Sequence, residues 1–222
     1  MILCLVTDRR RLGAAIGARA DEYIDALEAQ VVAAARAGVD LVQIREPDLG
    51  AARLTGLVRS ITIKCRETAA KILVNDRFDV ALAANAAGVH LKESSFSPDQ
   101  VRRLAPPGFI IGCSVHTPLT AAARRSADFL IAGTVMPTVS KQPADYLEWK
   151  GLEKVIDAAQ GTPVLGIGGM DLPSIPMLAA SGAAGLAAVG AFIPTAGQGP
   201  VEFVQKRVID MRFAFDSARG DP

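Results

Sequence analysis

Short apolar runs rich in Val, Ile and Leu recur along the chain, and alanine-rich amphipathic segments separate them. The runs are nearly continuous in apolar residues, which is typical of strands in a parallel sheet covered by helices. We expect eight strands, over residues 2–7, 41–45, 71–75, 88–91, 109–114, 129–133, 163–169 and 185–190. The helical pattern is clearest over residues 21–38, 51–68, 171–182 and 200–215.

Eight strand–helix units in 222 residues predict an α/β fold of the (β/α)₈ type, the TIM barrel. A doubly wound open sheet is the main alternative. Because we find neither a linker nor a low-complexity block, we expect residues 1–222 to form one barrel domain. The polar end of the chain, residues 216–222, is expected to be a frayed tail.

Composition narrows the class of protein. Half of the residues are apolar, and 24 basic residues oppose 23 acidic ones, so no net field would attract nucleic acid or an anionic membrane. The three cysteines, Cys4, Cys65 and Cys113, lack metal-ligand spacing, which favours a reducing, cytoplasmic setting. The first apolar run has only six residues, too few for a signal peptide or membrane span.

Polar side chains gather where the predicted strands end. In a (β/α)₈ barrel these carboxyl ends form the mouth that carries the active site. The polar residues at these ends are Thr7, Asp8, Gln43, Arg45, Glu46, Asn75, Asp76, Arg77, Lys92, Glu93, Ser94, Ser95, Ser114 and His116. We therefore expect a polar site at one end of the barrel.

The strand at 41–45 places an amide and a guanidinium on one face. Side chains alternate with period two, so Gln43 and Arg45 should face the barrel interior, and the two residues Val42 and Ile44 should face the helices. A guanidinium in such a place needs a carboxylate or a bound anion. Either a ligand supplies the anion, or a nearby acid does; the candidate acids are Glu46, Asp76 and Asp8.

Glycines follow the last two strands, in "GIGGMD" and "AVGAF". Exposed backbone N–H groups in these two adjacent loops cradle a phosphate in many barrels. We therefore expect a phosphate site formed by Gly168, Gly169, Val189 and Gly190. The alternative is that the glycines serve only tight turns.

The loop after the sixth strand is long and carries Thr138, Ser140 and Lys141, so it is a candidate lid. The other interpretation is a surface insertion. The two histidines are His90, inside the fourth strand, and His116, just past the fifth. Their spacing does not fit a zinc site, and His116 is the better candidate for proton transfer.

Six segments resemble the thiamin phosphate synthase/TenI superfamily. They are "VQIRE", "ILVNDRFDVALAANAAGVHL", "IIGCSVHT", "GTVMPTVSK", "PVLGIGGM" and "GAAGLAAVGAF", which occur in order over most of the chain. The resemblance implies a (β/α)₈ barrel, usually a homodimer, that binds a thiazole phosphate or thiamin phosphate. On this basis the residues expected to bind substrate are Gln43, Arg45, Asn75, Ser114, Thr138, Ser140 and Lys141.

Synthases of this superfamily join a hydroxymethylpyrimidine diphosphate to a thiazole phosphate with Mg²⁺. Asn75-Asp76-Arg77 matches their pattern, and Asp76 would be one Mg²⁺ ligand. The lysine that holds the diphosphate is Pro47 here, and the second metal-binding aspartate is absent from the segment Lys92–Ser95. The serine that helps hold phosphate after the eighth strand is replaced by Gly190.

Where the chain departs from the synthase pattern, it is similar to the TenI-like branch, through "SSFSPDQVRRL" (94–104) and "SVHT" (114–117). Its members shift a proton of a thiazole phosphate to give the aromatic tautomer, with no cofactor, and His116 would be the acid–base group. The main hypothesis is therefore a metal-free tautomerase. The alternatives are a Mg²⁺-dependent synthase and a non-catalytic regulatory barrel that binds thiamin phosphate.

Overall fold

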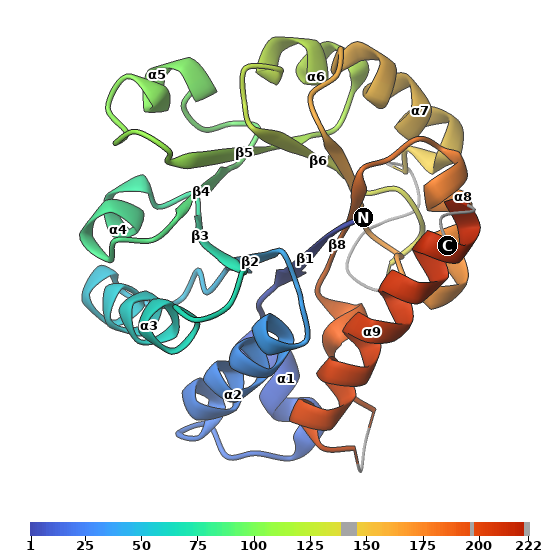
Figure 1. Cartoon of the computed structure of the whole chain (residues 1–222). Coiled ribbons are helices and arrows are strands. Elements are labelled where there is room, and N and C mark those ends of the chain that lie inside the picture. The colour runs from blue at the N-terminus through green and yellow to red at the C-terminus, as the bar shows by residue number, and fades with distance from the viewer. Residues whose placement is uncertain (139–145, 196–197, 220–222) are drawn as a thin grey trace.

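A computed structural model describes residues 1–138, 146–195 and 198–219. Its centre is a closed barrel of eight parallel strands in the order β1 to β8 (Figure 1). The strands are β1 Ile2–Val6, β2 Leu41–Ile44, β3 Lys71–Asn75, β4 Gly88–Leu91, β5 Ile110–Val115, β6 Phe129–Gly133, β7 Val164–Ile167 and β8 Gly185–Ala188. Because β1 pairs with both β2 and β8, the ring has no edge, and the open-sheet alternative is excluded.

Helices surround the barrel in the view along its axis (Figure 1). They are α1 Arg9–Ile16, α2 Tyr23–Arg36, α3 Ala51–Lys64, α4 Phe78–Ala83, α5 Pro98–Arg102, α6 Pro118–Arg124, α7 Glu148–Ala158, α8 Ile175–Ala180 and α9 Pro200–Arg219, with short 3₁₀ segments η2 Leu172–Ser174 and η3 Gly190–Phe192. Within the described ranges, no helix is long and apolar enough to cross a membrane.

The apolar side chains form two separate cores. One core lies between strands and helices and includes Val42 and Ile44. The other fills the barrel and includes Leu41, Leu73 and Leu165. The alternation expected for residues 41–45 is therefore confirmed, because its odd-numbered apolar residue points inward and its even-numbered residues point to the helices.

The expected strands 163–169 and 185–190 end two residues early, at Ile167 and Ala188, and the expected helix 51–68 ends at Lys64. Three further details differ from the sequence expectations. Helix α1, which the sequence pattern did not indicate, is fixed at its ends by Asp8, whose carboxylate accepts from the Arg11 N–H, and by Gly17 in a left-handed conformation. The segment 171–182 divides into η2 and α8, because Pro173 and Pro176 interrupt its hydrogen bonding. Helix α9 continues to Arg219, so the expected frayed tail is helical over 216–219, and residues 220–222 lie outside the described ranges.

Candidate active site

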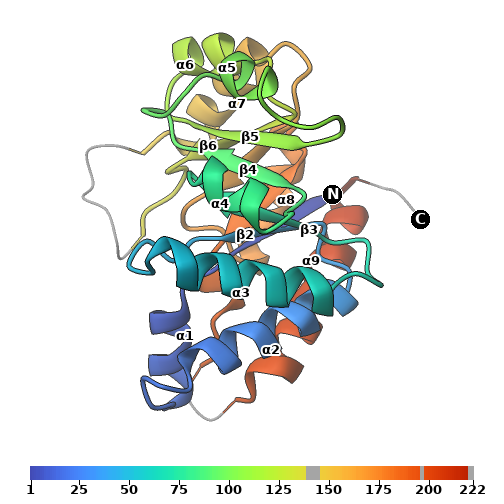
Figure 2. The same ribbon diagram turned by 90° about the vertical axis from the view of Figure 1, so that its left-hand side faces the viewer.

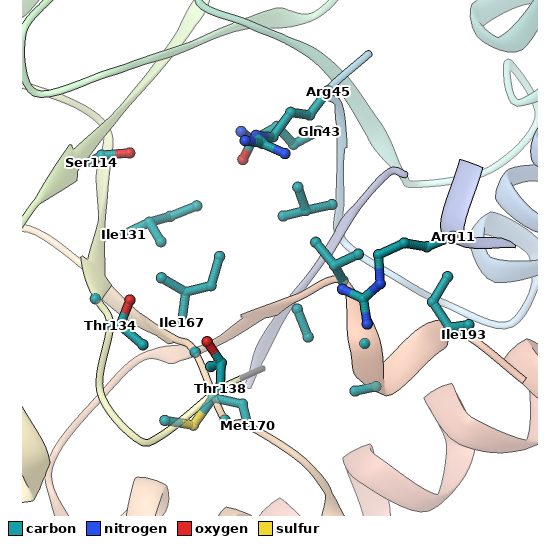
Figure 3. Close-up of a pocket in the computed structure, with 18 of the residues that line it drawn as sticks. Arg11, Gln43, Arg45, Ser114, Ile131, Thr134, Thr138, Ile167, Met170 and Ile193 are labelled. Carbon is teal, nitrogen blue, oxygen red and sulfur yellow. The ribbon is translucent and has the colours of Figure 1, made fainter. Parts of the chain in front are cut away.

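A cavity of about 1540 Å³ opens at the carboxyl ends of the strands (Figure 3). Every strand contributes to its wall, from Val6 on β1 to Ala188 on β8. The polar clustering expected at this mouth therefore corresponds to a real concave surface. It is large enough for a small phosphorylated heterocycle.

Two hydrogen-bonded pairs line the floor of the cavity. The Gln43 amide nitrogen donates to Asn75 Oδ1 over 2.8 Å, linking β2 to β3. His90 Nε2 and Ser114 Oγ lie 2.9 Å apart, linking β4 to β5. Gln43 and His90 are only 4% and 2% exposed, so their orientation is fixed by packing. The predicted ligand residues Gln43, Asn75 and Ser114 thus lie together and line the cavity.

His90, the weaker candidate for proton transfer in the sequence, belongs to the cavity wall. Burial lowers its pKa from 6.5 to about 3, while nearby Asp76 opposes the shift. The ring is therefore neutral at physiological pH. Its Nδ1 has no hydrogen-bond partner in the described part of the chain. Phe129 lies beside the ring, with centroids 5.7 Å apart.

Arg45 does not pair with any of the three acids proposed for it. Glu46 instead accepts from the Thr7 hydroxyl and from Arg9, at 2.8 Å each. Asp76 pairs with Lys92. The Asp8 carboxylate accepts from a backbone N–H of α1, as described above. The Arg45 side chain instead lies beside Gln43 and faces the cavity (Figure 3).

His116 lies on the rim, hydrogen-bonded through Nδ1 to the carboxylate of Glu93. Thr117 begins α6 with a capping box, which fixes the backbone directly after His116. Burial would raise the pKa of Glu93, but hydrogen bonds from Thr120 and His116 outweigh it and lower that pKa. Glu93 is therefore an anion that orients the imidazole. Sequence spacing did not reveal this pair, because the two residues come from different loops.

The carboxylate of Asp76 is already engaged by a side-chain cation. Lys92 Nζ lies 2.7 Å from Oδ2, and the Ser95 hydroxyl donates to Oδ1. Burial would raise the pKa of Asp76, but these contacts outweigh it and lower the pKa. Among the described residues, no three His, Cys, Asp or Glu side chains gather as a metal site. The one carboxylate that the synthase resemblance would assign to Mg²⁺ is neutralised by Lys92, and the second is absent from the segment Lys92–Ser95. The residues present therefore do not fit that Mg²⁺ site.

The glycine loops after β7 and β8 both line the cavity. Gly168 and Gly169 have φ of +97° and +66°, and a Cβ on Gly168 would lie 2.3 Å from Thr134. Turn geometry and close packing therefore account for these two glycines. Gly190 differs, since among the described residues a Cβ there would meet only the Arg11 guanidinium, 3.4 Å from Nη2. Val189, the residue before it, is part of the same wall.

Two arginines near these loops were missed from the sequence. Arg11 projects from α1 towards the cavity (Figure 3), and Arg207 reaches it from α9. Arg207 Nη1 lies 2.8 Å from Asp171 Oδ1, so a carboxylate already balances its charge. The run "DRRR" after the first strand is the only sequence feature that could have indicated Arg11. Sequence reasoning did not use it because α1 was not expected.

The long loop after β6 is described only in part. Thr138 lines the cavity wall. Ser140 and Lys141, the other two residues predicted there, lie outside the described residues.

Comparisons with known proteins agree with this architecture. A family model described as thiamine monophosphate synthase matches residues 5–192. Thiamine-phosphate synthases of Roseiflexus castenholzii and Methanoculleus marisnigri are 35% and 34% identical; the matches cover 86% and 84% of this chain and 81% and 88% of those proteins. The solved thiamine phosphate pyrophosphorylase from Pyrococcus furiosus is 28% identical with a TM-score of 0.78, covering 98% of this chain and 96% of that one.

The two sequence relatives are named as thiamine-phosphate synthases, and the solved structure as a thiamine phosphate pyrophosphorylase. The family match spans most of the chain and includes seven of the eight strands in full, together with the end of β1. The chain therefore belongs to the thiamine monophosphate synthase family of thiamine-biosynthesis enzymes.

Proposed function

We propose that the protein is a thiazole phosphate tautomerase, which moves a proton within a phosphorylated thiazole to give its aromatic isomer. The observation that carries this proposal is the His116–Glu93 pair at the rim of the cavity. A proton shift needs one oriented acid–base group and a site that holds the ligand. The cavity offers both.

The hydrogen bond to Glu93 determines which imidazole atom can react. An ionised carboxylate accepts from Nδ1–H, which leaves Nε2 with a lone pair in the neutral ring. Nε2 can take a proton from the ligand ring, and the same imidazole can return a proton to the atom two positions away. Atoms and charge balance without an oxidant or a second substrate. Glu93 acts as a positioning residue that also stabilises the transient imidazolium.

Aromatisation of the thiazole favours the product, so binding and proton transfer are sufficient. In this proposal the phosphate lies against the loops after β7 and β8, and the ring lies over the floor made by Gln43, Asn75 and Ser114. Arg45 supplies a cation near that floor that can accept an anionic group of the ligand as its partner. The pocket does not depend on Asp76, whose carboxylate is held by Lys92.

Thiamin phosphate synthesis is the second candidate, and the names of the relatives favour it. Gln43, Arg45 and Asn75 match its pattern, as the resemblance implies. Two features oppose it: Pro47 offers no charge to a diphosphate, and Lys92 occupies the carboxylate that would hold Mg²⁺. The tautomerase proposal requires neither a diphosphate site nor a metal.

One assay separates the two activities. Purified protein is supplied either with the non-aromatic thiazole phosphate in EDTA, or with pyrimidine diphosphate, thiazole phosphate and Mg²⁺. We expect aromatisation that does not depend on metal, and its rate is measured by ultraviolet absorbance. Mg²⁺-dependent thiamin phosphate formation at an ordinary enzymatic rate would overturn the proposal in favour of the synthase. A protein that runs neither reaction would be a binding barrel.

The first prediction concerns His116 itself. His116→Ala should lower aromatisation roughly 100-fold or more, because general acid–base catalysis contributes about that much, while phosphate binding is retained. Titration calorimetry with thiazole phosphate checks the binding. Asp79→Asn is the matched control, since that carboxylate pairs with Arg77 on the surface, outside the cavity wall. Unchanged turnover in His116→Ala would reject the assignment.

A further inference from the structure

The sequence Arg9-Arg10-Arg11 opens α1, and the structure directs the three guanidinium groups differently. Arg9 pairs with Glu46 and Asp48, and Arg10 pairs with Asp48. These two side chains therefore fasten α1 to the loop after β2. Arg11 takes no part in that network and turns towards the cavity instead (Figure 3).

The guanidinium of Arg11 lies beside the loop that follows β8. Its Nη2 is 3.4 Å from the position that a Cβ on Gly190 would occupy. Ile193, a little further along the same loop, also lines the cavity (Figure 3). A larger side chain at position 190 and the Arg11 guanidinium would compete for the same space. Glycine at this position leaves the space beside the guanidinium open.

Arg11 carries a positive charge that no acid of the described residues balances at this end of the cavity. Across the described residues, its side chain has no carboxylate or other hydrogen-bond partner, whereas Arg207 in the same wall is balanced by Asp171. A guanidinium that faces a cavity without a counter-ion attracts an anionic ligand group. The position next to the Gly190 backbone makes phosphate the matching group, because its several oxygens can accept from both at once.

We propose that Arg11 binds the phosphate of the ligand directly, in place of the serine hydroxyl that the synthase resemblance would put at position 190. This inference rests on the proposed function only in that the ligand carries a phosphate. The planar fork of the guanidinium donates to two phosphate oxygens, while the backbone of Gly190 remains available to a third. The chain thus exchanges a neutral donor in the loop after β8 for a charged donor on α1.

The experiment compares phosphorylated and unphosphorylated ligands by titration calorimetry. The probes are thiazole phosphate, the corresponding thiazole alcohol, and thiamin phosphate with thiamin. Arg11→Ala should weaken binding of both phosphates roughly 10- to 100-fold and leave the two alcohols unchanged. Arg10→Ala is the matched control, since Arg10 lies next in sequence but contacts Asp48 and does not line the cavity.

Three results would overturn the proposal. They are wild-type phosphate affinity in Arg11→Ala, an equal loss for phosphates and alcohols, and a wild-type protein that binds neither phosphate more tightly than its alcohol. Binding is measured without turnover, so failure of the tautomerase assay leaves this test intact. An inactive protein whose phosphate affinity depends on Arg11 would reject the proposed function and support the inference.

A separate experiment tests whether Arg11 replaces a serine hydroxyl at position 190. In Arg11→Ala combined with Gly190→Ser, the serine hydroxyl occupies the vacated space, and phosphate affinity should recover by roughly tenfold over Arg11→Ala. A double variant that binds no more tightly than Arg11→Ala would contradict the exchange.

Discussion

The two histidines show how surroundings decide what one residue type does. His90 is enclosed by β4, β5 and Phe129, and burial keeps it neutral. His116 is on the rim, where Glu93 fixes one nitrogen and solvent or ligand can reach the other. Only the second histidine can exchange protons with a substrate without the cost of a buried charge. The first is suited to hold a neutral hydrogen bond to Ser114.

The neutral state of His90 makes stability depend on pH. Its pKa is about 3 in the folded protein and about 6.5 when exposed, so below pH 6.5 the unfolded chain binds a proton that the native state does not. Stability should therefore fall as the pH falls from 6.5 towards 3, by at most about 1.4 kcal/mol per pH unit from this residue.

Urea unfolding of wild type and His90→Gln across this range checks the prediction. The free energy of unfolding of wild type minus that of His90→Gln should fall steadily below pH 6.5. The contribution of the carboxylates is common to both proteins and cancels in this difference. Curves that remain parallel from pH 7 to pH 4 would show that His90 is not held neutral.

At the scale of elements, the strands were predictable and one helix was not. Each strand is a short apolar run whose inner and outer faces follow the period of two, so sequence alone placed Gln43 correctly on the inner face. Helix α1 was not predicted because its sequence, "RRRLGAAI", is short and three of its eight residues are arginine. Its ends depend on Asp8 and Gly17, which a search for apolar periodicity does not detect.

The same reasoning explains which site residues could be predicted. Gln43, Asn75 and Ser114 follow from strand ends, where topology alone brings side chains together. Arg11 and Glu93 depend on the three-dimensional path of loops and of a short helix, and no spacing rule relates them to Gly190 or His116. Sequence therefore predicts the floor of the cavity better than its rim.

Two glycines in different elements should respond oppositely to alanine. On β5, a Cβ at Gly112 would lie 2.2 Å from Phe129 and 2.7 Å from His90 Nδ1, so Gly112→Ala should destabilise by about 1–3 kcal/mol. In α3, Gly56 has open space around it, and Gly56→Ala should stabilise by roughly 0.5–1 kcal/mol. Urea midpoints measure both. Equal shifts in one direction would contradict the packing around His90.

The closed ring governs how the whole molecule can open. Figure 2 shows the strands running side by side within the helical cover, and each strand has a hydrogen-bonded neighbour on both sides. Removal of any strand would leave two unpaired edges and expose both cores. Partial opening is therefore costly, and we expect β1 and β5, on opposite sides of the ring, to become accessible together.

The thiols report on this opening. Cys4 on β1 and Cys113 on β5 are both fully buried, and burial raises the pKa of each to about 12, so neither offers a thiolate in the native state. In Cys65→Ser protein, which removes the third thiol, a disulfide reagent should label both at one common rate. That rate should fall about 100-fold when thiazole phosphate is present at about 100 times its Kd, because the ligand binds only the closed barrel.

Mass spectrometry of the labelled peptides resolves the two sites. Distinct rates for Cys4 and Cys113, or labelling that ignores a saturating ligand, would show that the strands open separately and that the cavity is not coupled to closure of the ring.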